Sequence, residues 1–302
     1  MNDSNNARVV RIALVAIPVL LFSLIFLQRR IDVSAAPLQD EKPDLVLRSG
    51  AMLKKLSLGY DPLLADIYWT RAVQYFGERV GMRGATFQLL APLLDITTTL
   101  DPHLMLAYRF GAIFLSEPEP AGAGRADLAV DLVQKGIAAN PDQWRLYEDL
   151  GLIYSIHLKD YQKAAAAYLE GSKNPKAQIY MKVMAAIVAQ KGDSLETSRL
   201  IWAEVYSTTQ DKLVKQRALQ HVESLDAAID LKRLNESSEN YWQKFGRYPR
   251  TIQELRDAGL ATEKLEDPAG FPYVMGAYGV PQLNPESPIL LDLYQKMPLR
   301  NH

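Results

Sequence analysis

The chain has 302 residues, with 34 Lys and Arg against 35 Asp and Glu, and it contains no cysteine. At about 100–200 residues per domain, this length predicts one or two domains, and a formal net charge of −1 excludes a globally basic nucleic-acid-binding protein. The absence of cysteine excludes disulfides, thiol catalysis and thiolate metal sites.

The first distinctive segment is an uncharged apolar run near the N-terminus. Residues 12–27 read IALVAIPVLLFSLIFL, with Arg11 before them and Arg29-Arg30 after them. With the two valines before Arg11, the run extends over residues 9–27, close to the ~20 residues that a helix needs to cross a bilayer. The sequence therefore predicts a membrane-spanning helix. A buried helix of a soluble domain would instead show an amphipathic pattern, which this run lacks.

Cleavage and orientation of this segment are separate questions. A cleaved secretory signal is the alternative to an anchor, because Val33-Ser34-Ala35 offers small residues of the kind that signal peptidase accepts. Charged residues between that site and the apolar run favour an uncleaved, single-pass anchor. Basic residues lie on both sides of the run, so charge discriminates weakly between orientations. Because short N-terminal tails usually stay in the cytoplasm, we expect an inner-membrane protein whose body is extracytoplasmic.

The rest of the chain changes character twice. A polar, proline-containing stretch predicts a linker, and after it apolar residues recur at i, i+3, i+4 and i+7, which predicts helices. A further change in composition begins at Gly246. We therefore divide the chain into a tail and anchor (1–30), a linker (31–44), helical repeats (45–210), a capping helix (211–245) and a small C-terminal module (246–302).

Internal repetition identifies the kind of helical body. Two sets of landmarks recur with nearly the same period: Pro102, Pro141 and Pro175 are 39 and 34 residues apart, and Gly111, Gly151 and Ala185 are 40 and 34 residues apart. A period near ~34 residues is typical of solenoids, in which each helix pair buries its apolar face by stacking on its neighbours. An ordinary helical bundle with accidental spacing is the alternative.

The central repeat carries a recognisable pattern. Its first helix has Tyr147, Leu150-Gly151 and Tyr154, and after a turn its second helix has Ala164, Tyr168 and Gly171 before the closing Pro175. This order resembles the tetratricopeptide repeat, with one extra residue in the turn between its helices. The resemblance covers residues 61–206, with weaker units on both sides. It implies an all-α fold: an α-solenoid of about three to four helix pairs with a concave groove that binds peptides.

The resemblance also implies which residues line that groove. Aligned on Gly111, Gly151 and Ala185, the groove positions of three successive first helices are Met105, Tyr108, Ala112, Leu115 and Ser116; Arg145, Glu148, Leu152, Ser155 and Ile156; and Ile179, Lys182, Ala186, Ala189 and Gln190. From these we predict a partner-binding site with an apolar bias, formed by Tyr108, Leu115, Arg145, Glu148, Leu152, Ser155, Lys182 and Gln190. This set lacks the basic residues of a carboxylate clamp, so a helix or an extended peptide with apolar anchors is the expected ligand.

The C-terminal segment carries a second resemblance. The sequences YWQKFGRYPRTIQELRDAGL and DPAGFPY are similar to the C-terminal part of type II secretion pseudopilins. Gly246 is expected to end a helix, Thr251 to cap a short one and Asp267-Pro268 with Gly270 to form a tight turn. The N-terminal processing site of a pseudopilin is missing, so the protein is not expected to be a pilin subunit. A plain turn motif that packs a short tail against the repeats is the alternative.

No catalytic motif emerges from the sequence. The four histidines are far apart, no phosphate-binding glycine loop is present, and no serine lies in a G-x-S-x-G elbow. We therefore expect no enzyme activity, no cofactor and no metal.

The sequence thus predicts a non-catalytic, membrane-anchored scaffold or assembly factor. Its partners would be proteins of the membrane or cell envelope, such as parts of a pilus or secretion machine, with no nucleic acid among them. Self-association stays open. The alternatives are a structural subunit of a larger membrane complex and an unrecognised envelope enzyme.

Overall fold

The computed structural model describes residues 49–261 and 265–291, together with four positions in helical conformation, Ile17, Val19, Ser23 and Ile25. The chain divides into two units, 1–47 and 48–302, and all the elements below belong to the second. Among the residues described, no helix is both long and apolar enough to cross a membrane. The predicted anchor lies outside the described residues except for those four positions, and the predicted linker lies wholly outside them.

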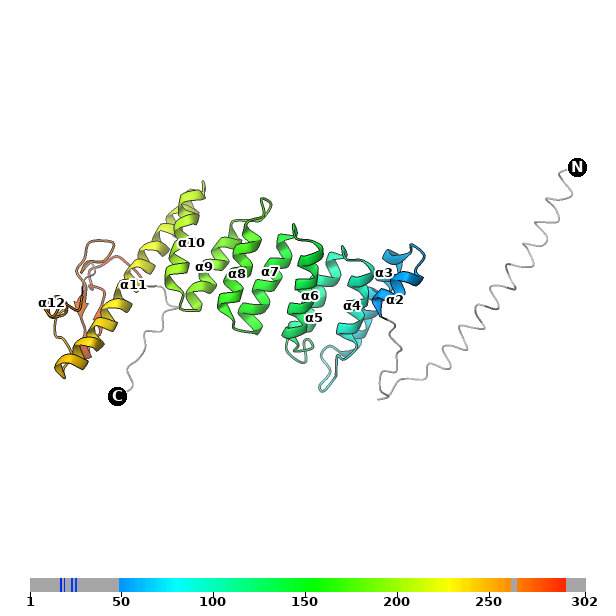
Figure 1. The fold of residues 1–302 in the computed structure, drawn as a ribbon, viewed down its shortest axis with the longest axis horizontal. Helices are drawn as coiled ribbons and strands as arrows, with labels where there is room; N and C mark the ends of the chain where they lie inside the picture. The colour runs from blue at the N-terminus through cyan, green and yellow to red at the C-terminus, as the bar shows by residue number, and fades with distance from the viewer. Residues whose placement is uncertain are drawn as a thin grey trace, which may run out of the picture. The chain divides into compact units, whose positions relative to one another are not determined.

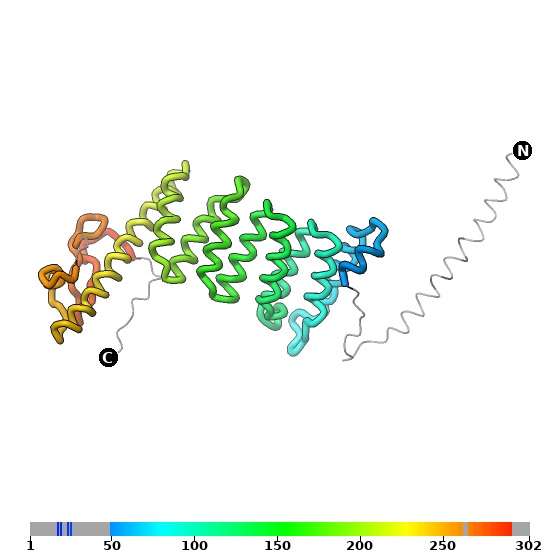
Figure 2. The backbone as a smooth tube through the Cα atoms, in the orientation of Figure 1, coloured from blue at the N-terminus to red at the C-terminus, as the bar shows by residue number. Residues whose placement is uncertain are grey.

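The described chain is mostly helical and has almost no strand, which confirms the predicted all-α class. Successive helices form pairs, and each pair packs on the next one along the chain. Figure 1 shows the pairs stacked in a row, and Figure 2 shows the backbone passing from one pair to the next in sequence order. The pairs are α3 (Asp61–Arg79) with α4 (Leu90–Leu100), α5 (Met105–Ser116) with α6 (Ala126–Ala139), α7 (Trp144–Leu152) with α8 (Tyr161–Ser172), and α9 (Tyr180–Lys191) with α10 (Leu195–Thr208).

Glycines allow close approach of the helices within this row. A Cβ atom added at Gly136 would lie 2.8 Å from the ring of Tyr108, and one added at Gly151 would lie 2.7 Å from the ring of Tyr168. Both rings are buried, with exposed fractions of 0% and 1%. Each buried tyrosine therefore occupies the space that a missing side chain leaves on the facing helix.

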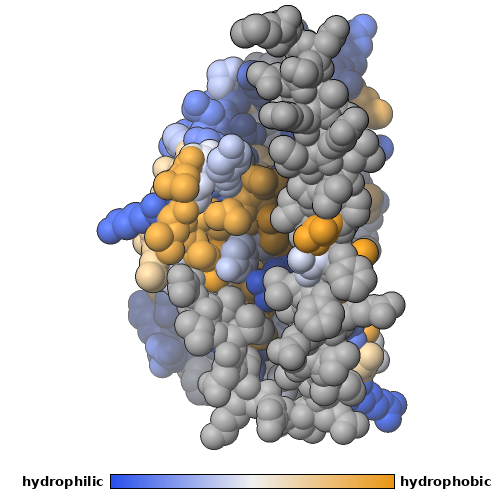
Figure 3. All heavy atoms as spheres, turned by 90° about the vertical axis from the view of Figure 1, so that its right-hand side faces the viewer, coloured by the Kyte–Doolittle hydropathy of each residue, from blue (hydrophilic) through white to orange (hydrophobic). Residues whose placement is uncertain are grey.

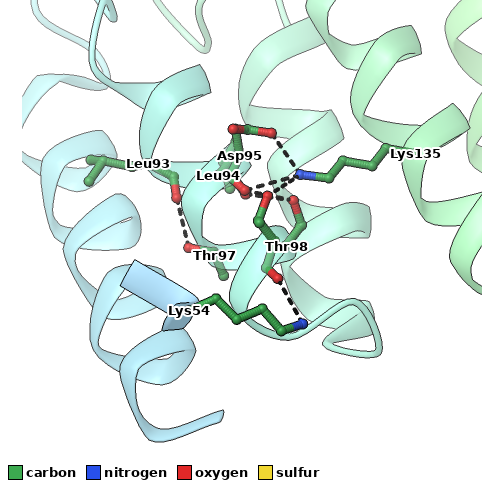
Figure 4. A network of polar contacts seen from close by, with 8 residues as sticks. Lys54, Leu93, Leu94, Asp95, Thr97, Thr98 and Lys135 are labelled. Atoms are coloured by element: carbon green, nitrogen blue, oxygen red, sulfur yellow. Dashed lines mark hydrogen bonds and ion pairs between the residues drawn. The ribbon is translucent and has the colours of Figure 1, made fainter. Parts of the chain in front are cut away.

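A short helix precedes the first pair and is held by polar contacts. Helix α2 (Gly50–Leu56) is capped by the Ser49 hydroxyl, and Lys54 Nζ donates to the Thr99 carbonyl of α4 at 3.4 Å. From the other side, Lys135 Nζ of α6 donates to Asp95 Oδ1 at 2.6 Å and to Thr99 Oγ1 at 2.8 Å. Figure 4 shows both lysines pointing toward α4, so this helix joins α2 to the second pair.

The extra residue in the turn of the central repeat is accommodated by a π-helix. Helix α7 continues directly into η1 (Ile153–His157), whose end is marked by a hydrogen bond of 3.1 Å from Leu158 N to the Ile153 carbonyl. A π turn takes up one additional residue without breaking the helix. Asp160 then caps α8, and its side chain accepts from Lys163 N at 3.1 Å. The insertion therefore lengthens the first helix instead of the loop.

The last repeat is followed by a long helix, α11 (Lys212–Phe245). The Asp211 side chain caps its N-terminus by accepting from Leu213 N and Val214 N. Gly246 ends it in the left-handed conformation, with φ of +69°, which confirms its predicted role as a helix stop. The first part of α11 packs on α10 and buries Ala218 and Leu225 in the core of the last repeats.

The C-terminal module packs on the last part of α11. It contains α12 (Ile252–Asp257), the 3-10 helix η2 (Ala277–Gly279) and a two-stranded antiparallel sheet of β1 (Val274–Met275) and β2 (Pro281–Gln282), in which Val274 faces Gln282. Its own apolar core joins Leu231, Leu234 and Tyr241 of α11 to Ile252, Leu255, Ala261 and Tyr273. The module is therefore a distinct small core built on the end of the helix.

Two turns in this module match their sequence motifs. The Thr251 side chain accepts from Glu254 N at 3.3 Å and begins α12, as predicted. Asp267 Oδ1 accepts from Ala269 N and from Phe271 N at 2.9 Å each, and Gly270 has φ of +85°. The predicted tight turn is thus present. The Tyr273 hydroxyl, which follows it, donates to Asp230 of α11 at 3.1 Å and attaches the turn to the helix.

We expect Leu255→Ala to unfold this module without unfolding the repeats. Leu255 is fully buried, and removing such a side chain costs about 2–5 kcal/mol. Hydrogen exchange measured by mass spectrometry should show faster exchange over α12 and unchanged protection over α5–α10. Gln253→Ala, on the exposed side of the same helix, serves as the control. Loss of protection throughout the repeats would contradict a separate core.

Candidate partner-binding face

The first helices of successive pairs lie side by side, and polar contacts connect them. Arg109 of α5 forms two hydrogen bonds with Asp149 of α7, Nε to Oδ2 at 2.8 Å and Nη2 to Oδ1 at 3.1 Å. Arg109 Nη2 is also 3.8 Å from Glu148 Oε2, and Glu148 accepts a hydrogen bond from the Tyr180 hydroxyl of α9. One polar chain therefore crosses α5, α7 and α9.

The glycine contacts define which residues are equivalent in α5 and α7. The Tyr108 ring packs on Gly136, and Tyr147 packs through its Cβ on the corresponding Gly171 of the next pair. The two tyrosines are 39 residues apart, which is the spacing from Pro102 to Pro141 and not the 40 residues between the glycine landmarks. The predicted alignment of α5 with α7, which matched Gly111 to Gly151, is therefore wrong by one residue.

This shift changes the exposed side of α5, because one residue rotates a position by about 100° around a helix. Of the predicted site residues, Tyr108 and Leu115 are buried, with exposed fractions of 0% and 1%, and Gln190 of α9 is buried at 8%. These three side chains belong to the core and cannot line an open surface. The residues that α5 exposes instead are Leu106, Phe110 and Ile113, beside the half-buried Arg109.

The other five predicted residues are accessible. Arg145 and Leu152 are exposed, and Glu148, Ser155 and Lys182 are half-buried. We use the name first-helix face for the accessible residues on α5, on α7 and its continuation η1, and at the start of α9: Leu106, Arg109, Phe110, Ile113, Arg145, Glu148, Leu152, Ser155, Ile156, Ile179 and Lys182. The sequence missed the α5 members, and the spacing of the prolines was the signal that would have found them.

Opposite charges are largely neutralised across this face. Burial raises the pKa of Asp149, although the hydrogen bonds from Arg109 oppose that shift. Burial, followed by the hydrogen bond to Glu148, raises the pKa of Tyr180. Lys182 pairs with Glu204 of α10, and the Arg145 guanidinium lies 4.8 Å from the centre of the Trp144 ring. A ligand would thus meet a surface of low net charge.

Apolar side chains flank the polar chain on all three helices. Large exposed fractions are found at Leu106 (53%), Ile113 (50%) and Ile156 (52%), with Leu152 and Ile179 somewhat less exposed. The apolar surface extends toward α3 through an aromatic group, in which Phe114 stacks on Phe76 with ring centres 4.0 Å apart. Such a row of apolar anchors can bind the apolar side of a helix or an extended peptide.

The structure offers no assembled metal cluster within residues 49–261 and 265–291. No group of three or more His, Asp and Glu side chains lies close enough there to hold a metal ion. His103 Nδ1 is 2.7 Å from Asn140 Oδ1, His157 is 3.9 Å from Glu117, and His221 stacks on Trp202. His302 lies outside the described residues.

Comparison with known proteins adds no relative: no protein family, curated protein or solved structure matches the chain.

Proposed function

We propose that the protein is a membrane-anchored, non-catalytic scaffold that captures a helix or an extended segment of a partner protein on its first-helix face. The observation that carries this proposal is the row of exposed apolar side chains on α5, α7 and α9, aligned beside a polar chain whose charges are already paired. A surface of this kind favours apolar anchors and does not select strongly for ligand charge.

The anchor and the cellular setting are part of the same proposal. Residues 9–27 would hold the body at the inner membrane on its extracytoplasmic side, which raises its effective concentration near other membrane proteins. The tetratricopeptide-like pattern supports a peptide-binding role. The pseudopilin-like C-terminal motif supports an envelope machine of the pilus or secretion type as the assembly that the scaffold serves.

Photo-crosslinking in the native membrane tests the capture surface. A photoreactive amino acid placed at Ile113 or at Leu152 should crosslink the same partner protein, because both side chains lie on the first-helix face. The same amino acid at Gln134, exposed on the second helix α6, is the matched control. Crosslinks at Gln134 alone would reject this face, and crosslinks only to further copies of the chain would identify a structural oligomer.

We expect Ile113→Asp combined with Leu152→Asp to abolish recovery of that partner. Both side chains are accessible, so the melting curve should change little, while two new charges in the apolar row prevent the anchors of the ligand from being buried. The control with the same change of charge is Gln134→Asp combined with Gln162→Asp on the second helices. Unchanged recovery in the first variant would contradict the proposal.

A further inference from the structure

A second apolar surface lies at the N-terminal end of the row of pairs. We define the α2–α3 tip as the exposed apolar residues of α2, α3 and the turn between them: Met52 (48% exposed), Leu56 (54%), Leu58 (89%), Tyr60 (67%), Leu63 (57%) and Ile67 (47%). Figure 3 views the molecule from this end and shows hydrophobic side chains gathered into one patch. Soluble surfaces normally carry such side chains singly.

The backbone of the turn fixes the most exposed of these side chains. Leu58 and Gly59 both have positive φ, +52° and +90°. Positive φ is unfavourable for leucine, and the turn is held by hydrogen bonds from Ser57 Oγ to the Lys54 carbonyl at 2.8 Å and from Tyr60 N to the Ser57 carbonyl at 2.9 Å. The fold therefore holds Leu58 in an unfavourable backbone conformation between two helices. Its side chain is exposed, so burial within the chain does not offset the cost of that conformation.

The α2 side of the tip is basic. Residues 50–60 contain two exposed lysines, Lys54 and Lys55, and no acidic residue, whereas Asp61 and Asp66 lie on the α3 side, where Asp61 accepts from the Ser57 hydroxyl. An apolar patch with lysines beside it and a tyrosine among its residues is the composition of surfaces that enter the interface of a membrane with anionic lipids. A protein partner with apolar anchors would not need the lysines.

The position of the tip in the chain also favours lipid. Residues 28–51 separate it from the predicted anchor, and a chain of this length spans at most about 80 Å even when fully extended. The anchor would thus keep the tip within reach of the bilayer, where weak apolar contacts act at a high effective concentration.

We infer that the α2–α3 tip docks onto the surface of the membrane and binds anionic phospholipids, so that the N-terminal end of the repeats is held against the bilayer. This inference rests on the proposed anchor and adds a second, reversible contact to it. The docking would fix the direction in which the row of helix pairs leaves the membrane, and thereby the direction that the first-helix face presents to a partner.

The absence of cysteine makes the test direct. A single cysteine introduced as Leu58→Cys in the full chain is labelled with an environment-sensitive fluorophore, and the protein is reconstituted into vesicles of phosphatidylcholine and phosphatidylglycerol that contain a lipid-attached nitroxide quencher. Because interfacial side chains lie ~5–10 Å deep, we expect a blue-shifted spectrum and quenching by about half. Gln134→Cys, on the exposed side of α6, should show neither change. Lys55→Glu should reduce quenching at Leu58→Cys, as should vesicles of phosphatidylcholine alone.

Other occupants of the tip give different results, and each would overturn the inference. Energy transfer between labelled copies without quenching would mean that a second copy covers the tip. A blue-shifted label that is not quenched would mean that another part of the chain covers it. The anchor is judged separately, by whether the protein stays with the vesicles after alkaline extraction. An extracted protein rejects the anchor, whereas a retained protein with an unquenched label rejects only the docking.

Discussion

Tyr168→Ala is expected to lower the free energy of unfolding by about 3–5 kcal/mol, as is usual when a large aromatic side chain is removed from a core. The Tyr168 ring fills the space opposite Gly151 and belongs to the cluster that includes Trp144 and Met181. Its loss would leave a cavity between α7 and α8, in the middle of the row. Urea denaturation of the full chain in mild detergent, followed by circular dichroism, measures the change.

The position of this residue also predicts a change in cooperativity. In stacked repeats each unit is stabilised mainly by its neighbours, so a weakened central pair should uncouple α3–α6 from α9–α11 and broaden or split the transition. Tyr168→Phe keeps the ring and should cost less than about 1 kcal/mol. A loss as small as this for the alanine variant would mean that α7 and α8 do not pack through this ring.

The sequence predicted the helical architecture because a repeat leaves local evidence several times over. Each pair needs a small residue where its helices touch and a polar or glycine residue where a helix begins or ends. Thr251 and Gly246 therefore indicated their helix ends correctly. The same redundancy explains why the central repeat was the clearest, since Gly151 contacts Tyr168 and Gly171 contacts Tyr147.

The partner-binding face was harder to predict because a helix surface depends on register to a single residue. Two landmarks suggested spacings of 39 and 40 residues, and only the packing of Tyr108 on Gly136 decides between them. The choice of Gly111 as landmark assigned Tyr108 and Leu115 to the surface. In the structure Gly111 lies against Leu94 and Leu132, so it is a small residue at a different contact from the one that Gly151 makes.

Contacts between residues far apart in the chain could not be predicted from the sequence either. Arg109 and Asp149 are 40 residues apart, and Tyr273 and Asp230 are 43 residues apart. No local pattern pairs these side chains, because their meeting depends on how whole helices stack. The polar chain across the first helices and the attachment of the C-terminal turn to α11 thus follow from tertiary structure.

Raising the pH above 10 is expected to destabilise the repeats strongly, through their buried tyrosines. Burial raises the pKa of Tyr108 and of Tyr168 to about 12, from an ordinary value of 10.0. Between these values the unfolded chain loses the two phenolic protons while the folded chain keeps them. Unfolding then releases protons, so stability is complete below pH 10 and is lost as the pH rises toward 12.

The size of this effect follows from the shift of the pKa. Each tyrosine should contribute a loss of about 1.4 kcal/mol at pH 11, approaching about 2.7 kcal/mol above pH 12. The measurement is urea denaturation at a series of pH values between 8 and ~11.5. At each pH, the free energy of unfolding of a variant is subtracted from that of the unmodified protein, so that the difference reports the substituted residue. Tyr168→Phe should remove the contribution of Tyr168 and flatten the pH dependence, whereas Tyr60→Phe, whose side chain is 67% exposed, should not. If Tyr168→Phe and the unmodified protein lose stability in parallel, the hydroxyl of Tyr168 must reach water in the folded state, and the tight packing of α7 on α8 through Gly151 would be contradicted.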